Sequence, residues 1–137
     1  MGIFDFLWGN QQKKRPKTAP YGRFTLDGQD KMVVLQKWHE ILKMLDAGGP
    51  SHFRQAVLES DKLTNFVLGR MQISGETMGQ RLKSAGNRFS PKIYQGLWDA
   101  HKIRNRLVHE MDNEILNYEA KEAIEKYQAA LKDLGVI

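Results

Sequence analysis

The stretch Ser90–Met111, SPKIYQGLWDAHKIRNRLVHEM, determines how the rest of the sequence is interpreted. Ser90 followed by Pro91 is a helix start signal, because a capping hydroxyl precedes a proline at the first helical position. Apolar side chains then recur at helical spacing, and Arg104 falls inside their stripe: Ile93, Leu97, Ala100, Leu107, Val108 and Met111. The pattern predicts an amphipathic helix from Pro91 to about Met111 with a cation on its apolar side.

Helical periodicity also covers the chain on both sides of this stretch. One stripe comprises Val34, Trp38, Ile41, Leu42 and Leu45, and Gly48-Gly49-Pro50 ends it. A second helix with Ser51 as its cap and a shorter one from Met78 towards Phe89 follow the same pattern. A last helix is expected to be capped by Asn117, and its stripe comprises Ala120, Ile124, Tyr127, Leu131 and Leu134. Because no useful stretch alternates with a period of two, residues 27–137 are predicted to form an all-α, up-and-down bundle of about five helices.

Residues 1–26 differ from the rest and are predicted to form a flexible arm. Phe4, Phe6, Leu7 and Trp8 make its start apolar, and a basic stretch with prolines follows. One interpretation is weak attachment to a membrane surface, with the aromatic residues inserted and the lysines facing anionic lipid. The other is that this apolar turn covers part of the core or a partner subunit.

Composition excludes several classes of protein. The 137 residues contain no cysteine, which rules out disulfide frameworks and thiolate zinc sites and fits a reducing cytoplasm. No apolar run approaches the roughly 18 residues of a membrane span. Residues 70–106 hold eight Lys/Arg against Glu76 and Asp99, a net charge of +6, whereas residues 107–137 carry −4. A polyanion is therefore expected to approach the first of these two segments.

Arg104, Asn105 and His109 are the candidate reactive residues. Asn105 and His109 lie one turn apart, so the amide can orient the imidazole. Arg104 and His109 are five residues, about 140°, apart on one helix, and they converge on one ligand only if two copies of the helix meet. Imidazole can transfer protons at neutral pH and guanidinium can bind anionic oxygens, so the geometry of this set favours a site shared by the two copies of a dimer.

The segment Arg104-Asn105-Arg106-Leu107-Val108-His109 resembles the R-x4-6-H signature of HEPN domains. The resemblance extends to Leu97–His101 before the motif, to Glu110 after it, and to the closing helix, and it covers about residues 30–134. It implies a helical bundle that dimerises through the motif helices. Many members of this family are metal-independent endoribonucleases, several are toxins paired with nucleotidyltransferase-like antitoxins, and others are inactive and serve binding or assembly.

Transferred by position, the motif makes Arg104 and His109 the catalytic pair and Asn105 their polar partner. Five further cations are expected to steer RNA: Lys102, Arg106, Arg81, Lys83 and Arg88. One departure from the family pattern concerns charge. Active members usually present a basic cleft, whereas Glu110, Asp112 and Glu114 here place acidic residues just after His109.

Three interpretations therefore stay open for this motif. It could belong to a cytoplasmic nuclease, to a non-catalytic helical interaction module, or to the core, with Arg104 paired to an internal carboxylate. Asp61 and Glu59 could oppose Arg104, although a solvated face is favoured for them, and His101 is expected to support the site or lie at an interface. No metal or cofactor is expected, because His39-Glu40 and His52 lack a second ligand one turn away.

Overall fold

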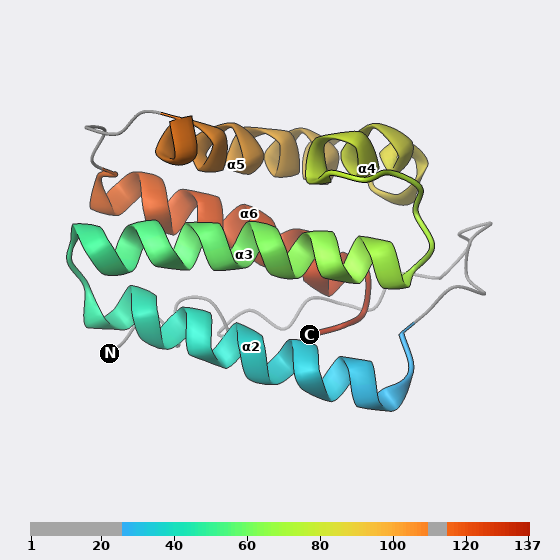
Figure 1. The fold of residues 1–137 in the computed structure, drawn as a ribbon, viewed down its shortest axis with the longest axis horizontal. Coiled ribbons are helices and arrows are strands. Elements are labelled where there is room, and N and C mark those ends of the chain that lie inside the picture. Colours follow the sequence, from blue (N-terminus) through green and yellow to red (C-terminus); the bar gives the residue numbers. More distant parts are fainter. Residues whose placement is uncertain (1–25, 110–114) are drawn as a thin grey trace.

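The computed structural model describes residues 26–109 and 115–137 and confirms the all-α bundle of about five helices (Figure 1). Within these residues there is no strand. The elements are α2 (Gly28–Ala47), α3 (Pro50–Arg70), α4 (Met78–Ser84), a 3₁₀ turn η1 (Gly86–Arg88), α5 (Pro91–His109) and α6 (Asn117–Asp133).

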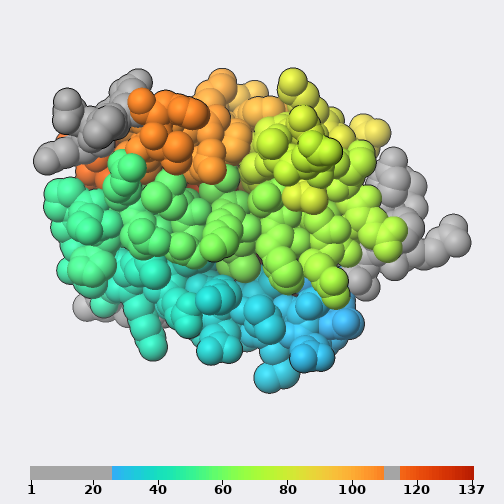
Figure 2. Space-filling model, viewed as in Figure 1, coloured from blue at the N-terminus to red at the C-terminus, as the bar shows by residue number. Residues whose placement is uncertain are grey.

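Helix α3 is the centre of the arrangement. It packs against α2, α4, α5 and α6, and the most extensive pairing elsewhere is between α5 and α6 (Figure 1). Successive long helices run in opposite directions, as the short connections require. In the space-filling view, α3 crosses the middle of the molecule between α2 and the α4–α5 layer (Figure 2). The junction of α3, α4 and α5 therefore lies on one face.

The predicted stripes form the core. Trp38, Leu42, Leu97, Tyr127 and Leu131 are among the fully buried side chains. Each belongs to an apolar stripe expected from the 3.6-residue period, because burying that side of an amphipathic helix removes the most apolar surface from water.

The N-terminal arm lies mostly outside the described residues, and so do Phe4, Phe6, Leu7 and Trp8. Leu26, which the sequence pattern placed in the arm, is buried in the core. None of the helices in the described ranges is long and apolar enough to cross a membrane.

Two predicted helix caps are wrong by one or two residues. Helix α3 begins at Pro50 after Gly49, so Ser51 lies inside the first turn and makes no capping hydrogen bond. Helix α6 has Leu116 rather than Asn117 at its cap, and the Leu116 amide donates to Glu119 Oε1 at 3.3 Å. In α6 the Glu119 carboxylate, rather than the Asn117 side chain, accepts from a backbone N–H at the positive N-terminal end of the helix. The Ser90 cap of α5 is confirmed by a hydrogen bond from the Ile93 amide at 3.4 Å.

Gly75 makes the turn that places α4 against α3. Its φ of +142° lies in a region that L side chains rarely adopt. A Cβ at this position would lie 2.7 Å from the Arg81 backbone nitrogen, closer than real Cβ contacts. Only a glycine at position 75 therefore allows α4 to begin at this place.

We expect Gly75→Ala to lower the free energy of unfolding by roughly 2 kcal/mol, because it combines backbone strain with a backbone clash. The midpoint of urea denaturation measures this loss. Gly28→Ala is the matched control, since its Cβ meets nothing within 4 Å and its φ is ordinary. Equal midpoints for the two variants would contradict the role given to Gly75.

Candidate functional site

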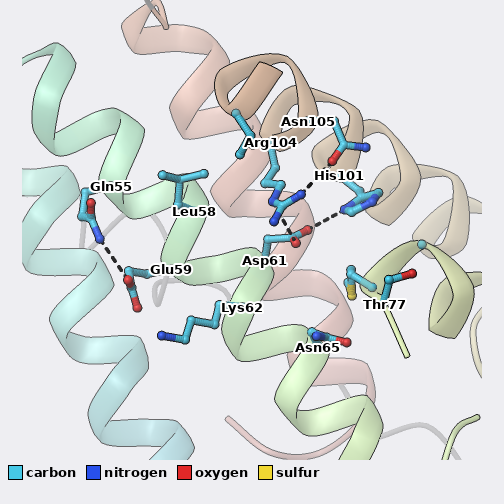
Figure 3. Close-up of a pocket in the computed structure, with 13 residues that line it drawn as sticks. Gln55, Leu58, Glu59, Asp61, Lys62, Asn65, Thr77, His101, Arg104 and Asn105 are labelled. Atoms are coloured by element: carbon cyan, nitrogen blue, oxygen red, sulfur yellow. Dashed lines mark hydrogen bonds and ion pairs between the residues drawn. The ribbon is translucent and has the colours of Figure 1, made fainter. Parts of the chain in front are cut away.

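A pocket of about 690 Å³ opens where α3, the start of α4 and α5 meet. Figure 3 shows the side chains of these three elements converging on it. Nine of its thirteen lining residues are polar or charged, and the full set is Gln55, Leu58, Glu59, Asp61, Lys62, Asn65, Thr77, Met78, Gly79, His101, Arg104, Asn105 and Val108. The volume is in the range of small-molecule sites, and the lining combines two carboxylates, two cations, amides and an imidazole with apolar surface.

Asp61 is the hub of this pocket. Its Oδ1 accepts hydrogen bonds from His101 Nδ1 and from the Tyr127 hydroxyl, both at 2.8 Å. Its Oδ2 lies 3.5 Å from Arg104 Nε. Helices α3, α5 and α6 thus contribute one group or more each to a single contact network, part of which Figure 3 shows.

The network is deeply buried on one side and open on the other. The side chain of Asp61 is 4% exposed and that of His101 is 8% exposed, whereas Arg104 is 35% exposed. A carboxylate at that depth is costly unless donors surround it, and here three side chains do so. The guanidinium of Arg104 therefore closes the network towards solvent and also borders the pocket.

Two small polar side chains of α3, those of Ser60 and Thr64, are close to Asp61 in the sequence. Ser60 and Thr64 are fully buried, and their hydroxyls donate to the backbone oxygens of Ala56 and Ser60 at 2.7 and 2.8 Å. Because each hydroxyl is satisfied within its own helix, neither needs a partner from α5 or α6.

Tyr127 is a fixed donor in this network. Burial raises the pKa of its hydroxyl well above the usual value of 10.0, and the neighbouring Asp61 carboxylate raises it further, whereas Arg104 lowers it. The phenol thus stays protonated across the physiological range and donates to Asp61.

Aromatic residues of α5 hold α4 beside the pocket. The rings of Tyr94, Trp98 and His101 follow one another edge to face, with centroids 6.3 and 6.0 Å apart. The Tyr94 hydroxyl donates to the Leu82 backbone oxygen at 2.8 Å. This tie links the end of α4 to the helix that carries His101.

The structure places two of the three predicted reactive residues in the pocket. Arg104 and Asn105 line it, and Arg104 Nη1 donates to Asn105 Oδ1 at 2.9 Å. Asn105, expected to orient His109, instead has Arg104 as its partner here. His109 is the last residue of α5, is exposed, and does not line the pocket of its own chain.

The five cations expected to steer RNA fall into two groups. Lys102 and Lys83 are exposed. Arg106 pairs with Glu119 at 2.8 Å, Arg81 donates to Asn65 Oδ1 at 2.8 Å and to the Ile73 backbone oxygen at 3.4 Å, and Arg88 Nη2 lies 4.0 Å from the Met71 sulfur. The three arginines thus hold elements together, and Lys62, which the sequence did not single out, lines the pocket.

Sequence reasoning missed Asp61 and His101 as central residues. The sequence left two alternatives for Asp61, a place opposite Arg104 and, with preference, a solvated face, and the first is observed. His101 was expected to support the site or lie at an interface, and it forms a buried pair with Asp61. One signal was present, because Asp61 continues the stripe of Val57, Thr64 and Leu68 at helical spacing. Of the three interpretations of Arg104, its pairing with an internal carboxylate is observed.

Residues 26–109 and 115–137 contain no group of three His, Cys, Asp or Glu side chains arranged to hold a metal ion.

We expect Asp61→Ala to destabilise the fold by roughly 3–5 kcal/mol, because it leaves buried donors without their acceptor. Tyr127→Phe removes one donor and should cost about 1 kcal/mol. Asp99→Ala is the control, since that carboxylate is 41% exposed and its ion pair with Lys126 should be worth less than about 1 kcal/mol. Urea denaturation ranks the three, and a different order would contradict the hub role of Asp61.

Glu119 should make stability depend on pH. Its hydrogen bond from Arg106 holds its pKa below the usual 4.5, although burial opposes this. A depressed folded-state pKa stabilises the protein above pH 4.5, and this contribution is lost as the pH falls through the folded-state pKa. Glu119→Gln should therefore cost about 1 kcal/mol at pH 7 and less in acid. Urea denaturation at pH 7 and pH 3.5 tests this, with the exposed Glu122→Gln as control.

Comparison of the chain with models of known protein families, with curated proteins and with solved structures finds no match.

Proposed function

We propose that this protein binds RNA in the pocket between α3, α4 and α5 and cleaves it without a metal ion. The observation that carries the proposal is Arg104, whose guanidinium is fixed by Asp61 and Asn105 and still borders an open pocket. A guanidinium held in one orientation presents planar donors that match two oxygens of a phosphate group. Its remaining terminal nitrogen, Nη2, has no partner among the described residues and is available for such a ligand.

The chemistry follows from these residue types. In metal-free cleavage the 2′-hydroxyl of RNA attacks the adjacent phosphorus, and charge builds on the phosphate oxygens. Arg104 would stabilise that charge, which is the kind of contribution worth the most in a site shielded from water. The resemblance to HEPN domains, carried by Arg104–His109, points to the same reaction.

A homodimer supplies His109 in this proposal. Within one chain His109 lies at the exposed end of α5, outside the pocket, so a second copy must bring it to the phosphate. Val108, on the pocket lining, is 43% exposed, and Leu116 and Tyr118 at the start of α6 are 53% and 65% exposed. Apolar side chains at this end of the α5–α6 pair suit contact with another copy.

Lysines assist the approach of RNA. Lys62 lines the pocket, and Lys102 and Lys83 are exposed on α5 and α4. Exposed lysines attract a polyanion at long range, and their contacts with phosphate groups hardly distinguish one nucleotide sequence from another. A cytoplasmic toxin that is neutralised by a nucleotidyltransferase-like antitoxin is one biological setting for such an activity.

A non-catalytic interaction module is the second candidate. Met32 is 74% exposed, Val33 and Leu35 are 42% and 38% exposed, and Phe66 on the neighbouring α3 is 40% exposed. Large exposed apolar side chains on α2 and α3 favour contact with a protein partner. Attachment to a membrane surface would instead involve residues 1–17. Under this proposal RNA is neither cut nor bound.

We expect the purified protein to cut single-stranded RNA in the presence of EDTA and Arg104→Lys to cut about 100-fold more slowly, because lysine keeps the charge but loses the planar donors. Gel analysis of end-labelled RNA measures the rates. Arg70→Lys is the control, since Arg70 pairs with Asp30 at the C-terminal end of α3 and does not line the pocket.

The same oligonucleotide made as DNA separates binding from chemistry. It lacks the 2′-hydroxyl, so it should bind and remain uncut. Cleavage of the DNA, or equal cutting of RNA by wild type and Arg104→Lys, would refute the proposed reaction.

A further inference from the structure

The geometry of His101 fixes which of its ring nitrogens carries the proton. Nδ1 lies 2.8 Å from Asp61 Oδ1, and a carboxylate only accepts hydrogen bonds. Nδ1 must therefore be protonated. In the neutral ring this leaves Nε2 with a free lone pair, since one nitrogen of neutral imidazole donates and the other accepts.

Nε2 faces the pocket wall formed by the start of α4. A Cβ built on Gly79 would lie 3.7 Å from Nε2 and 4.0 Å from Thr77 Oγ1. The absence of a side chain at Gly79 therefore leaves space next to the lone pair. His101, Thr77 and Gly79 all line the pocket, and Figure 3 shows the imidazole and Thr77 on the same side of it.

From this arrangement we infer that His101 is a catalytic base of the pocket, with Nε2 accepting the proton of the RNA 2′-hydroxyl. The inference rests on the proposed function and adds to it a base from the same chain as Arg104. It does not follow from the motif, because His101 precedes Arg104 and lies outside the Arg104–His109 segment.

The proposed step conserves atoms and charge. The 2′-hydroxyl proton moves to His101 Nε2, the 2′ oxygen forms a bond to phosphorus, and the bond from phosphorus to the 5′ oxygen breaks. The 5′ oxygen takes a proton from His109 of a second copy or from water. The products are a 2′,3′-cyclic phosphate and a 5′-hydroxyl. His101 returns its proton to solvent, and a His109 that donated one regains it from solvent.

Asp61 and Tyr127 are positioning residues for this base. Asp61 fixes the ring orientation and stabilises the positive charge that the imidazole gains, as the acid does in catalytic triads. Tyr127 from α6 holds Asp61 at 2.8 Å. The groups that surround His101 are Asp61 on α3, Arg104 on α5 and Tyr127 on α6, while α4 presents Thr77 and the Gly79 backbone.

Two substitutions test His101 while preserving the fold. His101→Asn keeps an N–H that can donate to Asp61 but removes the acceptor at the Nε2 position. Gly79→Ala places a methyl group in ordinary contact with Nε2, and alanine favours helix at this position. Circular dichroism and urea denaturation check folding, and filter binding of labelled RNA checks affinity.

We expect His101→Asn to bind RNA within about twofold of wild type and to lose about 100-fold or more in cleavage rate. Gly79→Ala should lose at least about tenfold in rate, as expected for a small displacement of reacting groups. Wild-type cleavage should rise with pH as one group loses its proton, and the residual cleavage by His101→Asn should lack that rise. His39→Asn on α2 and Gly28→Ala are the controls and should cleave normally.

Three other outcomes would each overturn the role of His101 as a base. Wild-type rates for a folded His101→Asn, combined with loss of cleavage in Arg104→Lys and His109→Asn, would overturn the role of His101 and leave the proposed function standing. A wild-type protein that neither binds nor cuts RNA would overturn both. Loss of RNA affinity in His101→Asn, in parallel with its rate, would make His101 a binding residue and overturn its role as a base.

Discussion

One buried carboxylate constrains much of this molecule. Asp61 accepts hydrogen bonds from α5 and α6 at a point where α3 contacts both helices, and its charge must be compensated there. Apolar packing tolerates small shifts between helices, whereas hydrogen bonds of 2.8 Å do not. The network therefore adds orientation to a bundle that apolar burial alone would hold together less specifically.

The same carboxylate connects the core to the pocket. Asp61 contacts Tyr127 in the interior, His101 beside the pocket and Arg104 nearest the surface, and side-chain exposure rises to 35% at the guanidinium. A polar network whose buried groups all have hydrogen-bond partners can hold the side chains at its solvent-exposed edge in fixed orientations. In this protein the residues that specify the packing and those that border the pocket are largely the same.

Helical periodicity was sufficient to predict the fold. The stripes led by Trp38, Leu97 and Leu131 predicted the helices and their buried sides, because each reflects neighbours within about four residues. The caps predicted at Ser51 and Asn117 were wrong, since α3 already begins at Pro50 without a side-chain cap and α6 has Leu116 at its cap. The Asp61–His101 pair spans 40 residues, and no local pattern states which carboxylate meets which imidazole. For the pocket, the sequence identified Arg104 and Asn105, but it did not place Asp61, His101 and Tyr127 in one buried network.

Helix α4 has only seven residues, too few to be stable alone, and it depends on the Gly75 turn and on the tie from Tyr94 to Leu82. It nevertheless forms one wall of the pocket, whereas the long helices carry the buried network. This separation has an evolutionary consequence. Substitutions on the exposed side of α4 can change this wall of the pocket while α3, α5 and α6 keep the buried Asp61 network.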